Sequence, residues 1–82
     1  MGKHEKLIET ILHGKSDANI NFADICNLLL HLGFELRIKG SHHLFRRDGV
    51  EEKINLQKDG NKTKPYQVKQ VRQIILKYQL KE

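Results

Sequence analysis

Hydrophobic side chains recur at helical spacing in three separate stretches of the chain. Within each stretch the apolar positions lie three or four residues apart, so they form one stripe along an amphipathic helix. Gly14 follows the first stretch and Gly33 follows the second, which marks two helix ends. Asn21, with Asp24 three residues later, is typical of a helix N-cap. The pattern therefore predicts helices over about residues 3–13, 22–32 and 65–78.

Between the second and third helices the period of the pattern changes to two. Apolar and polar residues alternate in three short runs, which predicts β-strands over residues 34–39, 42–47 and 50–56. Gly40-Ser41 forms the first turn. Asp48-Gly49 is a strong signal for a two-residue hairpin, because a type I′ turn needs positive φ at both positions. Residues 57–64 are polar and predict a loop before the last helix.

The order of these elements is α-α-β-β-β-α, which predicts a single α+β domain. Three consecutive strands joined by short turns form an antiparallel meander, and the helices bury their apolar stripes against one face of it. A chain of 82 residues has a modest core. We therefore expect any active site to be a shallow surface groove.

The hairpin also predicts which side chains share a face of the sheet. Counting outward from a two-residue turn places His42 opposite Asn55. His42 then shares the polar, charged face, near Lys53 and within a few residues of Arg46. His43 points the other way, toward the helices, and is expected to be a partly buried, hydrogen-bonded residue at the edge of the core.

Positive charge is concentrated in the second part of the chain. Residues 1–33 carry three Lys or Arg against four Asp or Glu, whereas residues 34–82 carry twelve against six. The formal net charge of the whole chain is +5. This asymmetry favours a polyanionic partner, nucleic acid first, over the alternative of an ordinary solvated lysine-rich surface.

Cysteine content and hydropathy restrict the setting of the protein. Cys26 is the only cysteine, so it cannot form an intrachain disulfide, and we expect its thiol to be a small buried group. No apolar run approaches the ~20 residues that span a bilayer, and the N-terminus leads into no signal-type apolar segment. These features favour a cytoplasmic protein without membrane contact.

The histidines do not have the spacing of a metal site. His42 and His43 are neighbours in a strand, so their side chains point to opposite faces and cannot bind one metal ion together. The remaining histidines lie on predicted helices without ligand-type spacing. Neither a metal ion nor another cofactor is expected.

His42 has two interpretations. A lone surface histidine on a basic face usually contacts a phosphate or nothing. An imidazole can give up or accept a proton near neutral pH, so beside cations His42 is also a candidate general base or acid for RNA cleavage.

A longer pattern surrounds this histidine. A helix that ends in Leu-Gly-Phe is followed by a basic strand, by Gly40-Ser41-His42, by a hairpin, and by a helix that begins at Lys64-Pro65. In this order the pattern resembles the HicA (YcfA-like) family of toxin–antitoxin systems, whose Gly-Ser-His motif it matches without a gap. The resemblance covers about residues 21–80.

The resemblance implies a fold, an activity and a partner. Members of the HicA family have a fold like the double-stranded-RNA-binding domain, with three antiparallel strands and the helices on one face. They are mRNA interferases, endoribonucleases that arrest translation without a metal cofactor. An antitoxin protein, HicB, covers their site. The histidine after Gly-Ser is their catalytic residue, which corresponds to His42 in this sequence.

The chain departs from this family at its start. Typical members begin close to the helix that starts here near Phe22, so we expect a toxin domain over residues 21–82 and an N-terminal helical extension over residues 1–20. A helix of this length is marginal alone and needs a surface to pack on. The extension could cap the sheet or the helices, form a dimer contact, help to hold an antitoxin, or occupy the RNA surface.

The sequence thus predicts an RNA site on the open face of the sheet, with His42 as its acid–base residue. Gly40 and Ser41 shape the turn and allow close approach of the substrate. Phosphate contacts are expected from cations of the strands and of the last helix, namely Arg46, Lys53, Lys62, Lys64, Lys69 and Arg72. The alternative function is a binding module that uses the same basic face without cleaving RNA.

Overall fold

The computed structural model describes residues 2–80. Its elements in chain order are α1 (Lys3–His13), the 3₁₀ helix η1 (Asp17–Asn19), α2 (Phe22–His31), β1 (Glu35–Lys39), β2 (His42–Arg47), β3 (Val50–Asp59), β4 (Lys62–Thr63) and α3 (Pro65–Tyr78). The expected helices and strands are all present. Their bounds agree with the expected ones to within one residue, except at the end of β3.

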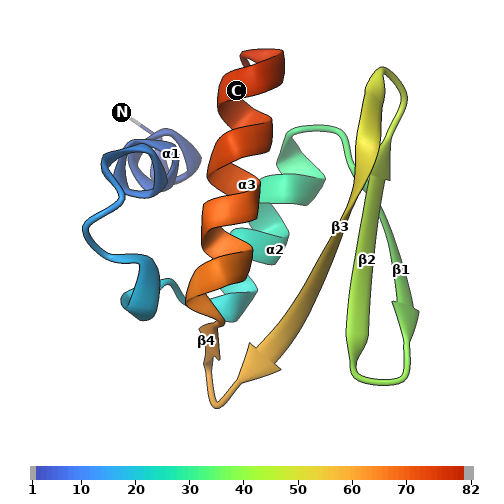
Figure 1. Cartoon of the computed structure of the whole chain (residues 1–82), viewed down its shortest axis with the longest axis horizontal. Helices are drawn as coiled ribbons and strands as arrows, with labels where there is room; N and C mark the ends of the chain where they lie inside the picture. The colour runs from blue at the N-terminus through green and yellow to red at the C-terminus, as the bar shows by residue number, and fades with distance from the viewer. Residues whose placement is uncertain (1, 81–82) are drawn as a thin grey trace.

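The molecule has two layers, with a third helix behind them. The strands form one antiparallel sheet in the order β1-β2-β3-β4. Helices α2 and α3 cover one face of this sheet, and α1 lies on the side of the helices that is away from it (Figure 1). The α+β fold class is therefore confirmed, and the arrangement is consistent with a fold like the double-stranded-RNA-binding domain. Because α1 packs behind the helices, it does not occupy the open face of the sheet.

The strand β4 and the helix η1 were not expected. Residues 57–64 are polar, so the alternation that marks a half-buried strand is missing there. Backbone pairing makes the strand instead: Lys58 lies opposite Thr63, and the N–H of Thr63 donates to the carbonyl oxygen of Ile20 (2.9 Å). The short strand is held between the end of β3 and the segment before α2.

A β-bulge between Phe45 and Arg47 shifts the register of the central hairpin. Arg47 lies opposite Val50, as expected from the two-residue turn. Beyond the bulge the partners move by two residues, so His42 lies opposite Gln57 and not opposite Asn55. A shift of two residues leaves every side chain on its expected face, because side chains alternate with a period of two.

The second helix ends as its sequence predicts. Gly33 has φ 94°, and the N–H of Phe34 donates to the carbonyl oxygen of Leu29 (3.0 Å). This is a Schellman ending, with the buried Phe34 ring supplying its hydrophobic contact. At the other end, the Asn21 side chain accepts a hydrogen bond from the N–H of Asp24 (3.2 Å), so the expected N-cap is confirmed. These caps set the direction in which the chain enters β1.

The core lies between the sheet and the helices. Phe45, Ile54 and Leu56 supply the inner face of the sheet and are fully buried. Burial also raises the pKa of the Cys26 thiol to about 11, so it is a packing group and not a nucleophile at neutral pH. No helix within residues 2–80 has the length and hydrophobicity needed to span a membrane.

Candidate nucleic-acid interface

His42 is the first residue of β2 and stands on the face of the sheet that the helices leave open. The turn before it contains Gly40 at φ 61°, a left-handed conformation that disfavours other residues. A Cβ atom at Gly40 would meet nothing within 4 Å, so the backbone angle and not crowding requires glycine here. His42 is exposed, as predicted.

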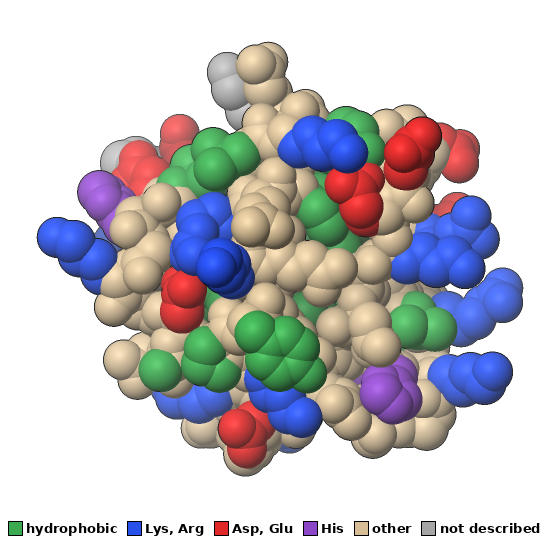
Figure 2. Space-filling view, in the orientation of Figure 1, with side chains coloured by type: hydrophobic (Ala, Val, Ile, Leu, Met, Phe, Trp, Pro, Cys, Tyr) green, Lys and Arg blue, Asp and Glu red, His purple; other side chains and the backbone are tan. Residues whose placement is uncertain are grey.

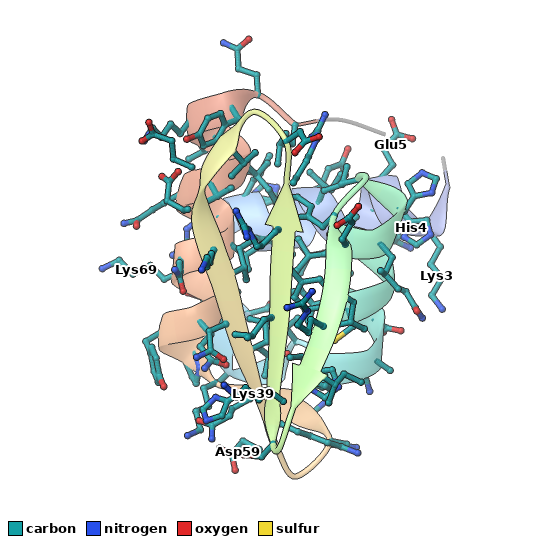
Figure 3. The ribbon with its side chains drawn as sticks, turned by 90° about the vertical axis from the view of Figure 1, so that its right-hand side faces the viewer. Lys3, His4, Glu5, Lys39, Asp59 and Lys69 are labelled. Atoms are coloured by element: carbon teal, nitrogen blue, oxygen red, sulfur yellow. The ribbon has the colours of Figure 1, made fainter. Side chains whose placement is uncertain are left out.

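Three residues of the neighbouring strands lie next to His42 in the register of the sheet. Lys39 of β1 lies directly opposite His42 in the register, and Gln57 of β3 lies opposite on the other side. Asn55 is the diagonal neighbour, and its Oδ1 lies 3.1 Å from His42 Nδ1. The imidazole is therefore hydrogen-bonded on one nitrogen, with a cation on the adjacent strand. Figure 3 shows Lys39 and Asp59 at this end of the sheet.

A chain of hydrogen bonds connects the Gly40-Ser41 turn to the start of α3. Gln57 Nε2 donates to Ser41 Oγ (3.5 Å), and Lys64 Nζ donates to Gln57 Oε1 (3.2 Å). The backbone N–H of Gln57 donates to the buried Gln67 Oε1 (2.8 Å), which ties β3 to α3. The Lys64 ammonium is thereby held near the residue that faces His42. Ser41 and Lys64, both predicted site residues, lie in this one cluster.

His43 faces the helices, as predicted, but the expected hydrogen bond is absent. Its ring meets Phe22 edge-on, with 4.9 Å between ring centroids. Its Nδ1 is buried and has no hydrogen-bond partner among the described residues. The expectation failed because the inner face at this position offers aromatic surface and not a polar group. His43 is thus a packing residue.

Arg46 and Lys53 lie at the other end of the open face, around the β2–β3 hairpin. They line a shallow groove together with further residues of β1, β2 and the turns next to them, namely Gly33, Glu35, Leu36, Arg37, Leu44, Arg47 and Asp48. Lys53 is therefore not beside His42, as the sequence had suggested, because the bulge moves β3 by two residues. The cations of β1, Lys39 and Arg37, were not predicted as site residues.

The remaining predicted cations are divided between two places. Lys62 and Lys64 lie where β4 leads into α3, next to the Gln57 cluster. Lys69 projects from the side of α3 and not over the strands (Figure 3). Along the sheet side of the molecule, Lys and Arg side chains gather in one band with a histidine beside them (Figure 2).

Arg72 was predicted to contact phosphates, but the structure pairs its side chain with Asp17. Its guanidinium binds both carboxylate oxygens of Asp17, with the shortest distance 2.9 Å, and also donates to the carbonyl oxygen of Ile11 (3.1 Å). The side chains of the pair are only 17% and 22% exposed. Arg72 therefore attaches the N-terminal segment to α3 and is not available on the sheet face. No sequence pattern indicates this pairing, because its partners lie 55 residues apart.

No group of three or more His, Cys, Asp or Glu side chains that could hold a metal ion forms among residues 2–80. The chemistry that the residues at this site can supply is proton transfer by an imidazole and charge stabilisation by ammonium and guanidinium groups.

Comparison with known proteins identifies a family that the chain matches. A family described as "HicA toxin of bacterial toxin-antitoxin" matches residues 22–81. No curated protein and no solved structure gives a significant match to the chain. The matched region begins at the first residue of α2 and includes the sheet, the Gly40-Ser41-His42 turn and α3.

Proposed function

Because this chain belongs to the HicA toxin family of bacterial toxin–antitoxin systems, we propose that it is an mRNA interferase, an endoribonuclease that arrests translation and uses His42 without a metal cofactor. The observation that carries the proposal is the position of His42. It is exposed on the open sheet face, opposite Lys39 of β1 and opposite Gln57 of β3, whose side chain accepts a hydrogen bond from Lys64. A cytoplasmic location follows from an mRNA substrate.

In the proposed reaction His42 removes the proton of a ribose 2′-OH. The 2′-oxygen attacks the adjacent phosphorus, and the bond from phosphorus to the 5′-oxygen breaks. The leaving 5′-oxygen takes up a proton, from the imidazolium or from water. The products are a 2′,3′-cyclic phosphate end and a 5′-hydroxyl end. Positive charge near the phosphate stabilises the negative charge that develops on its oxygens.

The cations divide into two roles by their place on the sheet. Lys39 is paired with His42 in the β1–β2 register and Lys64 is bonded to Gln57, the partner of His42 on β3, so we assign both to the reacting phosphate. Arg46 and Lys53 lie at the hairpin end and would position the RNA strand through its other phosphates. Lys62 extends the surface toward α3. Lys69 would meet RNA that continues past the edge of the sheet.

We also propose the partner and the division of the chain. A HicB-type antitoxin would bind the His42 side of the sheet and exclude RNA from it. Residues 21–82 would form the toxin domain, with residues 1–20 as an extension that docks behind the helices and leaves the site open.

The test compares His42→Ala with His13→Ala, which removes an exposed histidine of α1. Purified proteins are incubated with mRNA in the presence of EDTA, and circular dichroism checks that both variants are folded. We expect His42→Ala to lower the cleavage rate by about 10²–10⁴-fold, the usual contribution of one acid–base residue. His13→Ala should retain the wild-type rate, and the products should carry cyclic phosphate ends.

Two results would overturn the proposal. Retained cleavage by folded His42→Ala would remove His42 from the mechanism, and loss of cleavage in EDTA would contradict metal independence. A wild-type protein that binds RNA but leaves it intact would support the alternative, a binding module on the same basic face.

A further inference from the structure

The hydrogen bond between Asn55 and His42 has a direct consequence for proton transfer. His42 Nδ1 lies 3.1 Å from Asn55 Oδ1, and both residues are exposed on the open face. The register shift between Phe45 and Arg47 makes Gln57 the direct partner of His42 and Asn55 its diagonal neighbour. Diagonal neighbours on one face of a sheet are within reach of long side chains.

An amide oxygen only accepts hydrogen bonds, so the proton in this contact belongs to His42 Nδ1. A neutral imidazole has one N–H, which leaves Nε2 with its lone pair. A ring with no partner in water favours the opposite tautomer, with the proton on Nε2. The Asn55 oxygen therefore selects the less common form of the ring.

We propose that Asn55 is a positioning residue for His42, which holds the imidazole with its proton on Nδ1 and leaves Nε2 as the nitrogen that accepts the 2′-OH proton. This inference rests on the proposed ribonuclease function. It gives that function an orienting group of the kind that catalytic histidines generally require on their second nitrogen.

The orienting group, the Asn55 amide, carries no charge, so it does not change the balance of charges around the His42 ring. Lys39 faces His42 from β1, and Lys64 reaches the Gln57 side chain from the start of α3. Asp59 is the other diagonal neighbour on β3, and no salt bridge joins it to His42. Asp59 already places one negative charge near His42. Because the Asn55 amide is neutral, it orients the ring without adding another negative charge beside the phosphate that must bind there.

The first test reads the tautomer directly and needs no enzymatic activity. Long-range ¹H–¹⁵N NMR spectra of the histidine rings are recorded at a pH where His42 is neutral. We expect a protonated Nδ1 and a bare Nε2 in the wild-type protein. Asn55→Ala should move the ring toward the Nε2–H form, whereas the control Asn27→Ala, at an exposed position of α2, should not.

The second test measures cleavage. Asn55→Ala should lower kcat by about 10–100-fold, the usual effect of removing an orienting partner, and change the Kd for RNA less than twofold. Asn55→Asp places a carboxylate against Nδ1, so the acid limb of the pH–rate profile should move upward by about one pH unit or more.

A wild-type ring with its proton on Nε2 overturns the proposal, even if His42 is essential for cleavage. So does an Asn55→Ala variant with an unchanged tautomer and rate. Retained cleavage by His42→Ala would instead overturn the proposed function, and the NMR result would still decide whether Asn55 sets the tautomer.

Discussion

The Glu52 carboxylate accepts hydrogen bonds from two side chains of α3. Tyr78 Oη donates to Oε1 (2.6 Å) and Lys77 Nζ donates to Oε2 (3.0 Å). The hydrogen bond from Tyr78, and then that from Lys77, holds the pKa of Glu52 below its ordinary value. The backbone N–H of Glu51 also donates to Tyr78 Oη (3.2 Å). This small network attaches the end of α3 to β3.

We predict that Glu52 makes stability depend on pH in the acid range. A carboxyl group with a lowered pKa in the folded state adds stability above its unfolded pKa, about 4.3, and loses it as the pH falls through the folded value. Glu52→Gln should therefore be less stable than wild type at neutral pH, and the difference should shrink toward about pH 3. Urea denaturation at several pH values measures this, with Glu51→Gln as the control. A difference that is the same at every pH would contradict the prediction.

At the scale of elements, the N-terminal extension is attached by buried apolar side chains of α1 and by the Arg72–Asp17 ion pair. Ile8 and Ile11 are buried. Arg72 then holds both Asp17 and the last turn of α1, as its guanidinium meets the Ile11 carbonyl oxygen. Gly14 leaves room for this guanidinium, because a Cβ atom there would lie 3.1 Å from Nη1. The N-terminal extension is thus attached to α3 through the Arg72 side chain.

We predict that Asp17→Ala destabilises the protein by about 1–3 kcal/mol, because it leaves the partly buried Arg72 without its charged acceptor. Asp24→Ala is the control, since its pair with Lys3 is long (3.6 Å) and mostly exposed. It should cost about 1 kcal/mol or less. Thermal or urea unfolding measures both. RNA cleavage by folded Asp17→Ala should stay at the wild-type rate, and a lower rate would show that α1 does influence the site.

The strands show which parts of the site could be predicted from the sequence alone. Strand alternation and the Asp48-Gly49 turn predicted correctly that His42 faces outward and His43 inward. The bulge next to Phe45 could not be predicted, because no glycine or other turn residue marks it. The exact neighbours of His42 depend on that bulge. Asn55 was expected opposite His42 and is in fact diagonal to it, where the hydrogen bond forms.

At the scale of the whole molecule, the excess of positive charge lies in the second part of the chain and is shared between the sheet and α3. The net charge of +5 alone did not show which cations are paired with a carboxylate and which are available to bind phosphate. Arg72 was counted as a phosphate contact although Asp17 neutralises it, because the pairing of distant residues is invisible in composition. Lys39 was left out, because the β1–β2 register that places it opposite His42 exists only in the folded sheet.

We predict that RNA affinity falls steeply with salt and that Lys39 accounts for part of the slope. Each phosphate neutralised contributes about 0.7 to the slope of log K against log salt for a single strand. Lys39→Gln should therefore reduce the slope by roughly that amount. Lys6→Gln, at an exposed position of α1 behind the helices, should leave the slope unchanged. Fluorescence anisotropy with a short RNA, titrated at several salt concentrations, measures the slopes. Equal slopes for both variants would move the interface away from β1.

The Arg72–Asp17 pair also orders events during synthesis. Its partners are separated by 55 positions, and α3 follows all the other described elements along the chain. The docking of the early helix therefore cannot be completed until α3 has been synthesised, and β3 needs Gln67 of α3 to complete its anchoring. Both contacts depend on one helix, so the N-terminal extension and the sheet should gain their final stability in the same folding step.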